Sequence, residues 1–220
     1  FTYRGAWGSE GKFSLGNAIE DGEAALLLAD VFSRQNRTVD AKRTLERAAA
    51  AGAASARLTA RLEQLRAEEA LHAGFNQSLN GRFTVLFEGP PEQSLAGRVL
   101  EVLDEAWARV AQTLFTPPGS PIVVTLYTEA QFTDITRAPA WAAAAFDGRI
   151  RLPVRGALAD REELGRVLTH ELAHAFVRAV APRNVPAWLD EGIASLVEPR
   201  GLDWAREEVL SAKRLLPHAA

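Results

Sequence analysis

The segment 170–174 reads H-E-L-A-H and holds two of the four histidines of the chain. On an α-helix, residues four apart lie about 40° apart around the axis and about 6 Å apart along it, so both imidazoles share one face. Neutral imidazole nitrogen is a preferred ligand of Zn²⁺. Glu171 lies beside this face, where its carboxylate can contact a metal-bound water rather than the metal.

The alternative is a surface helix with two solvated histidines and an ordinary exposed glutamate. The flanking pairs 167–168 (Val-Leu) and 176–177 (Phe-Val) are apolar and therefore favour a buried helix. Because a buried histidine requires a partner, burial favours the metal interpretation.

A catalytic zinc site needs a third protein ligand and keeps one position for water. The pattern H-E-x-x-H-x-x-G-x-x-H is excluded, because positions 177 and 180 are both valine. Downstream, residues 186–194 read P-A-W-L-D-E-G-I-A, and Glu191 lies 17 residues after His174. The prolines at 182 and 186 end the first helix and permit a reversal, so we expect Glu191 to face the histidine pair.

H-E-L-A-H followed by W-L-x-E-G-x-A resembles the gluzincin zinc metallopeptidases, which include the thermolysin-like and neutral aminopeptidase families. With the helical region and the F-D-G-R-I-R-L-P-V segment, the chain is similar to the bacterial peptidase-MA-like family with tetratricopeptide repeats. The resemblance covers residues 80–200 and, more loosely, 22–75. It implies that His170, His174 and Glu191 bind one Zn²⁺. It also implies that Glu171 is the general base and acid that moves a proton from a metal-activated water to the leaving amine.

The resemblance also implies an α+β, zincin-like catalytic domain: a twisted mixed sheet over the H-E-L-A-H helix, with an edge strand along the substrate cleft. Gluzincins commonly stabilise the oxyanion with a Tyr or His after the third ligand. This chain has no Tyr after Tyr127, and only His218 follows Glu191. The stabiliser is therefore His218 or a residue beyond position 220, or catalysis is weak.

Neighbours of the ligands are candidates for orienting the imidazoles by hydrogen bonds. Asp190 and Thr169 each adjoin a predicted ligand in the sequence. Glu198 matches a recurrent glutamate of the aminopeptidase branch, and we interpret it as a surface charge.

The first third of the chain has helical periodicity over residues 21–35, 40–51 and 54–75. The first two predicted helices resemble a tetratricopeptide repeat, a unit of about 34 residues, and any helical hairpin is the alternative. The matching positions are Leu28, Ala29, Phe32, Ala41, Leu45 and Ala48. We therefore expect a helical, tetratricopeptide-like segment over residues 1–78, which could bind a protein partner, and a linker at 77–81.

The remainder, 79–220, is the predicted metallopeptidase domain, incomplete at its C-terminus. Strands are predicted at 82–88 and 122–127, amphipathic helices at 95–114 and 160–180, and a hairpin at 142–154 with a type I′ turn at Asp147-Gly148. Pro153 cannot donate to a ladder and so predicts a sheet edge. Arg149 and Arg151 share the face opposite Ile150, where they could bind a substrate carboxylate or remain solvated.

Composition excludes several classes of protein. The chain has 220 residues and a net charge of −3, so no basic surplus favours nucleic acid. Cysteine is absent, which excludes disulfides and thiolate metal sites. No apolar run approaches the about 18 residues of a membrane span. The chain begins at Phe1 and has no methionine, so we expect a preceding segment; a cell-envelope or secreted location is a guess from this alone.

The sequence therefore predicts a zinc-dependent hydrolase acting on a peptide or protein substrate. One rival hypothesis is a catalytically weak or inactive zincin scaffold whose tetratricopeptide-like helices bind partners. The other is a metallohydrolase that cleaves esters.

Overall fold

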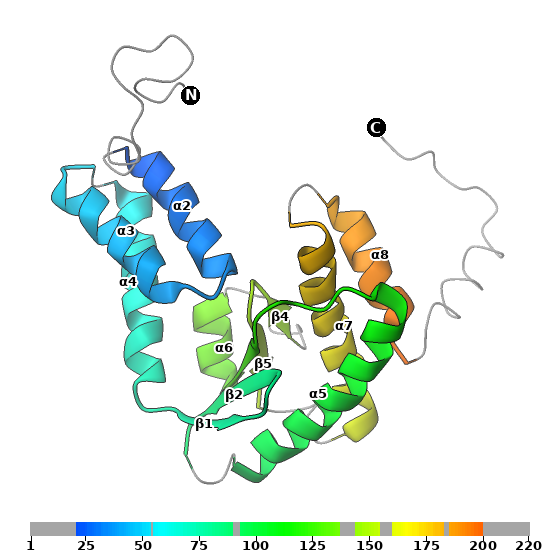
Figure 1. Cartoon of the computed structure of the whole chain (residues 1–220). Coiled ribbons are helices and arrows are strands. Elements are labelled where there is room, and N and C mark those ends of the chain that lie inside the picture. The colour runs from blue at the N-terminus through cyan, green and yellow to red at the C-terminus, as the bar shows by residue number, and fades with distance from the viewer. Residues whose placement is uncertain are drawn as a thin grey trace, which may run out of the picture.

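The computed structural model describes residues 21–53, 55–89, 93–136, 144–154, 160–182 and 185–199. Over these residues the chain forms seven helices and a five-stranded mixed sheet (Figure 1). Helices α2 to α4 stand together on one side of the sheet, and α5, α7 and α8 lie on the other (Figure 1). The α+β class predicted from the sequence is confirmed.

The N-terminal helices are α2 (Gly22–Arg34), α3 (Thr38–Ala50) and α4 (Ala56–His72). Two of them begin at side-chain caps, where Asp21 accepts from the backbone N–H of residue 23 and Ser55 from that of residue 58. These caps satisfy backbone donors that a helix start otherwise leaves unpaired.

Small residues allow the first two helices to pack closely. Ala29, Ala41 and Leu45 are fully buried, and Phe32 packs partly buried against them. Helices α2 and α3 thus pack against each other, and α4 completes their apolar core through residues such as Leu58.

The sheet has the strand order β1-β2-β3-β5-β4, with β2, β3 and β5 parallel and both edge strands antiparallel to their neighbours. The strands are β1 (Asn76–Leu79), β2 (Phe83–Phe87), β3 (Ile122–Tyr127), β4 (Ala145–Phe146) and β5 (Ile150–Pro153). Two predictions are wrong here. Most of the predicted linker is strand β1, and the edge beside β5 is covered at Ile150 and Arg151 by β4.

Alternation along the strands gives the sheet two different faces. One face carries apolar residues such as Val124 and Leu152 and packs on α5 (Gln93–Leu114) and α7 (Arg161–Val180). Trp107 of α5 sits edge-on between Phe83 of β2 and Phe176 of α7, with ring centroids 5.6 and 4.9 Å away. This core fixes α7 against the sheet.

The opposite face is covered by α6 (Glu129–Thr136) and the end of α4. It holds a buried ionic cluster. Glu68 of α4 accepts from Arg149 at 2.9 Å and from Arg151 at 2.8 Å, and all three side chains are at most 5% exposed. Arg151 also donates to the Tyr127 hydroxyl at 2.8 Å. The sequence placed the two arginines on an exposed edge, which is wrong: their charges are paired internally because α4 covers this face.

The hairpin between β4 and β5 differs from the predicted two-residue type I′ turn. Three residues separate the strands, and only Gly148 has a positive φ, +113°. A Cβ at this position would lie 2.3 Å from the carbonyl oxygen of Arg34. Glycine is therefore required both by the backbone conformation and by close contact with the end of α2.

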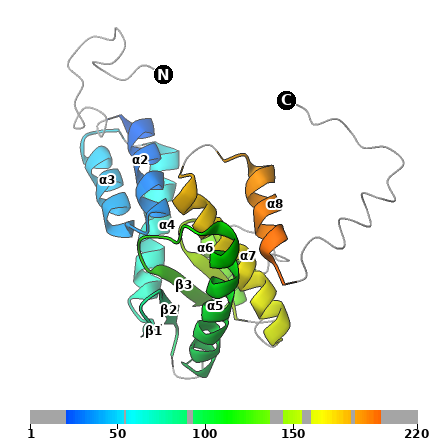
Figure 2. The ribbon, with the colours of Figure 1, turned by 45° about the vertical axis from the view of Figure 1, so that its right-hand side comes forward.

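The last described helix is α8 (Ala187–Val197), which lies beside α7 in both views (Figure 2). No helix in the described part of the chain combines the length and the apolar character needed to cross a bilayer.

Candidate metal centre

Helix α7 carries both histidines of the predicted motif. Its N-terminus is capped by Asp160, whose carboxylate accepts from the N–H of Glu162 at 2.8 Å. The helix is buried along most of its length, as its apolar flanks predicted. His170 and His174 lie one turn apart with ring centroids 4.9 Å from each other. One helix therefore presents two imidazoles side by side.

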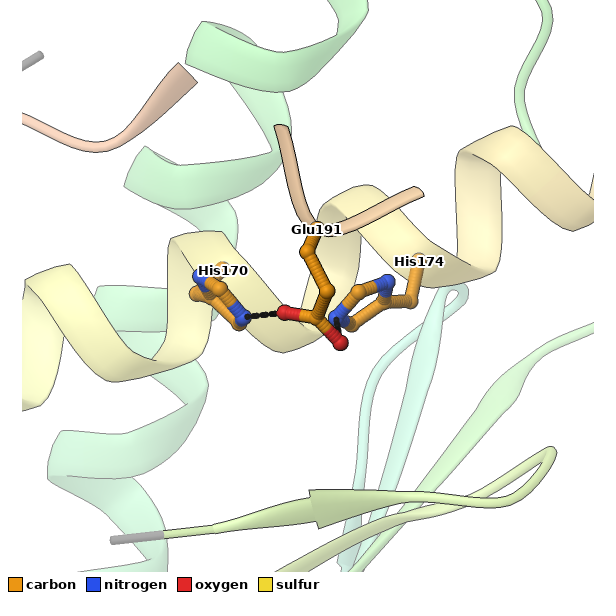
Figure 3. A group of neighbouring side chains, drawn as sticks. All are labelled: His170, His174 and Glu191. Carbon is orange, nitrogen blue, oxygen red and sulfur yellow. Dashed lines mark ion pairs between the residues drawn. The ribbon is translucent and has the colours of Figure 1, made fainter. Parts of the chain in front are cut away.

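Helix α8 brings a carboxylate to this pair. The chain reverses direction between α7 and α8 (Figure 1), and Pro186 is the N-cap residue of α8. The carboxylate of Glu191 points between the two imidazoles (Figure 3). Its oxygens lie 3.3 Å from Nε2 of His170 and 3.8 Å from Nε2 of His174. The structure thus brings together the three residues predicted to bind metal.

The other nitrogen of each ring contacts a second carboxylate. His174 Nδ1 lies 2.9 Å from Asp190 Oδ1, and His170 Nδ1 lies 2.8 Å from Glu198 Oε1. Because an ionised carboxylate only accepts, each Nδ1 carries the proton and donates it. The lone pair of each Nε2 is then free to bind a cation next to Glu191.

The spacing of these atoms fits a zinc ion. Ligand atoms of a tetrahedral site with bonds of about 2.0–2.1 Å lie about 3.4 Å from one another. One ligand atom from each of the three residues lies within 4.8 Å of the others, so small side-chain rotations suffice. The side chains of His170 and His174 are 21% and 10% exposed, whereas that of Glu191 is 64% exposed. The cluster is open on one side, as a site that admits substrate must be.

Glu171 lies between the two histidines in sequence and is only 8% exposed. Burial raises the pKa of its carboxyl above the ordinary value. The two imidazoles act in the opposite direction, and the charge of Glu191 adds to the increase. Glu171 therefore interacts electrostatically with all three predicted ligands without being one of the clustered ligand atoms.

No family model, curated protein or solved structure matches the chain.

A cleft of about 640 Å³ adjoins the cluster. His174 and Asp190 form part of its wall, together with Arg34 at the end of α2 and Arg178 in the last turn of α7. The cleft therefore meets the cluster at His174 and its partner Asp190, and it has room for a molecule of peptide size.

Three other residues predicted for the site contact different partners. The hydroxyl of Thr169 donates to the carbonyl oxygen of Gly165 at 2.6 Å and not to an imidazole. Arg149 and Arg151 lie on the opposite face of the sheet from α7, paired with Glu68. His218 lies outside the described residues.

Sequence reasoning missed two contributions. Glu198, interpreted as a surface charge, is 12% exposed and accepts from both His170 and Arg166. It is the C-cap residue of α8 and follows Glu191 by seven positions, about two helical turns, a spacing that could have revealed it. Phe146 of β4 lies parallel to the His174 ring, 6.3 Å between centroids, and no spacing in the sequence indicates this contact.

Proposed function

We propose that the chain is a zinc-dependent hydrolase that cleaves peptide bonds, built on a zincin-like fold. The observation that carries the proposal is the paired arrangement around His170 and His174. Each ring has its Nδ1 held by a carboxylate, while both Nε2 atoms face Glu191. Surface histidines have no need of such oriented partners, whereas metal ligands generally have them.

In this proposal His170, His174 and Glu191 hold one zinc ion. When bound, zinc supplies Lewis acidity, which polarises a carbonyl group and makes a water molecule more acidic. Glu171 would accept a proton from the attacking water and donate it to the departing amine, as a buried carboxylate beside the ligands can do. Asp190 and Glu198 keep the rings oriented.

A peptide is the preferred substrate class for two reasons. The cleft beside the cluster has the volume for several residues of extended chain. Strand β4, whose Phe146 contacts His174, lies at the edge of the sheet and has only β5 as a partner among the described strands. An extended peptide can pair with such an edge.

The test compares the wild-type chain, Glu171→Gln and Glu162→Gln, each with its zinc content measured. A panel of quenched peptides and matched amide and ester substrates is the probe. We expect the wild type and Glu162→Gln, an exposed position on the same helix, to cleave peptides when zinc is present. Glu171→Gln should keep its zinc and lose about 10²-fold or more in rate.

Three results would contradict this proposal. Unchanged cleavage by Glu171→Gln removes that residue from the mechanism. Zinc-loaded wild type that cleaves nothing favours the scaffold hypothesis, and cleavage of esters alone moves the substrate class away from peptides.

A further inference from the structure

Two arginines line the cleft that adjoins His174, one of the predicted metal ligands. Arg34 ends α2 and Arg178 lies in the last turn of α7, so two distant parts of the chain each bring an arginine to one cavity. The charge of Arg34 acts on that of Arg178. His174 lines the same cavity one helical turn before Arg178, about 6 Å along the helix axis.

Neither guanidinium group has a carboxylate within ion-pair distance among the described residues. Arg178 instead lies over the ring of Phe146, 4.7 Å from its centroid. Its Nη1 atom is buried and makes no hydrogen bond to any described residue. Most buried polar atoms in proteins are paired, so this donor indicates a missing acceptor.

The charges around Arg34 and Arg178 also indicate a missing negatively charged partner. Burial lowers the pKa of Arg178, and the nearby positive charge of Arg34 lowers it further. Asp190 and Asp147 act in the opposite direction without restoring the ordinary value. A negatively charged group entering the cleft would compensate both cations.

Phe146 lies in contact with both Arg178 and His174 of the metal cluster. The ring stacks on Arg178 and also lies parallel to the imidazole of His174, at 14° between planes. Arg178 and the predicted metal ligand are therefore held against the same aromatic side chain. An anion bound at the guanidinium groups would be placed beside the cluster.

We propose that Arg34 and Arg178 form a carboxylate-binding subsite of this centre, and that its substrates are peptides with a carboxylate close to the cleaved bond. The inference rests on the proposed function, because only a hydrolase has a substrate to bind here. The binding of a carboxylate by the two arginines does not need the metal. Arginine suits this role because its planar fork matches a carboxylate. The carboxylate can be the C-terminal group of a peptide or the side chain of an acidic residue.

The test measures binding and not turnover. Four dye-labelled peptides of one length are titrated into the full chain carrying Glu171→Gln, with and without zinc, and followed by fluorescence anisotropy. One pair differs only in a free or an amidated C-terminus. The other pair is amidated and differs in an internal Glu or Gln. We expect one carboxylate peptide to bind about ten-fold or more tightly than its neutral partner.

Arg34→Gln and Arg178→Gln should each reduce this preference, and the double variant should abolish it. Arg34 is exposed, so its substitution leaves the fold intact. Arg161→Gln is the matched control, because it removes the same charge from the other end of α7, where Arg161 pairs with Glu105. Circular dichroism checks the folding of each variant.

The peptide pair in which the charged peptide binds more tightly identifies the source of the carboxylate, a C-terminus or an acidic side chain. Either source supports the proposal. Equal binding of charged and neutral peptides overturns it, as does a preference that survives in the double variant. If the preference persists but the wild-type chain binds no zinc, the subsite stands and the proposed function fails.

Discussion

His170 donates from Nδ1 to Glu198 Oε1 at 2.8 Å, although the two residues lie 28 positions apart in the chain. Glu198 is held in turn by Arg166, whose Nη1 lies 3.1 Å from Oε2. The end of α8 therefore fixes one imidazole of α7, while the start of α8 supplies Glu191 and fixes the other through Asp190. One helix both completes the cluster and orients it.

Glu198→Gln should weaken zinc binding about 10- to 100-fold, because a neutral amide holds the Nδ1 proton less firmly and leaves His170 a weaker ligand. Competition with a chromogenic chelator measures the affinity. Glu63→Gln, an exposed carboxylate on α4, is the control and should bind zinc as the wild type does. Equal affinities of the two variants would show that Glu198 does not support the site.

Glu68→Gln should destabilise the fold by about 3–5 kcal/mol, because it leaves the buried charges of Arg149 and Arg151 without their shared partner. Glu69→Gln changes the next residue, whose ion pair with Lys42 is half exposed, and should change stability by less than about 1 kcal/mol. Urea denaturation measures both. Similar midpoints for the two variants would mean that the buried cluster contributes little to holding α4 on the sheet.

Acid should weaken the fold through His72, which lies 2.6 Å from the Tyr127 hydroxyl. Burial lowers the pKa of His72 from 6.5 to about 4, and Arg149 and Arg151 add to this against the opposing charge of Glu68. Between these two pH values the unfolded chain binds a proton that the folded chain does not. Stability therefore falls as the pH falls through this window, by up to ~2–3 kcal/mol.

Glu68 extends the loss of stability to lower pH. Burial alone would raise the pKa of its carboxyl, but Arg149 and Arg151 outweigh this and hold the pKa below the ordinary value. The contribution of Glu68 to the free energy of unfolding is present above pH 4.5 and is lost as the carboxylate protonates below that pH.

The His72 prediction is tested by urea midpoints of the wild type and His72→Gln from pH 7.5 to 4.5, which isolate the contribution of the histidine. Identical pH dependence of the two proteins would exclude His72 as its source.

Gly148→Ala should destabilise the protein by about 2–3 kcal/mol, because the new Cβ meets the backbone of Arg34 and the positive φ disfavours any side chain. Gly97→Ala is the matched control within α5. There a Cβ meets nothing within 4 Å, and the change should stabilise the helix by about 0.5–1 kcal/mol. Thermal unfolding measures both; a neutral Gly148→Ala would mean that the hairpin does not contact α2 as described.

The histidine pair and its helix could be predicted from the sequence because helical geometry is local. Four residues of separation place His170 and His174 on one face whatever surrounds them. Glu191 could be placed for a similar reason, since a proline-rich break between two helices favours a reversal. The position of Asp190 next to Glu191 predicts that it orients an imidazole, and the structure brings its carboxylate to His174.

The remaining contacts depend on long-range packing that no local pattern records. Arg149 and Arg151 alternate as an exposed strand would, and only the position of α4 makes their face buried. The same holds for Arg34, which reaches the cleft because α2 ends against the hairpin at Gly148. The edge strand β1 was missed because its polar residues resemble a linker, and its pairing with β2 is what orders them.

The coordination of zinc in the purified chain tests the central claim most directly. X-ray absorption at the zinc edge, together with metal analysis, should give one ion per chain with two imidazole nitrogens and a carboxylate oxygen at about 2.0–2.2 Å. His174→Phe should lose that ion while keeping the helical circular dichroism. A chain that binds no zinc at micromolar concentration, or binds it equally well after His174→Phe, would contradict the account.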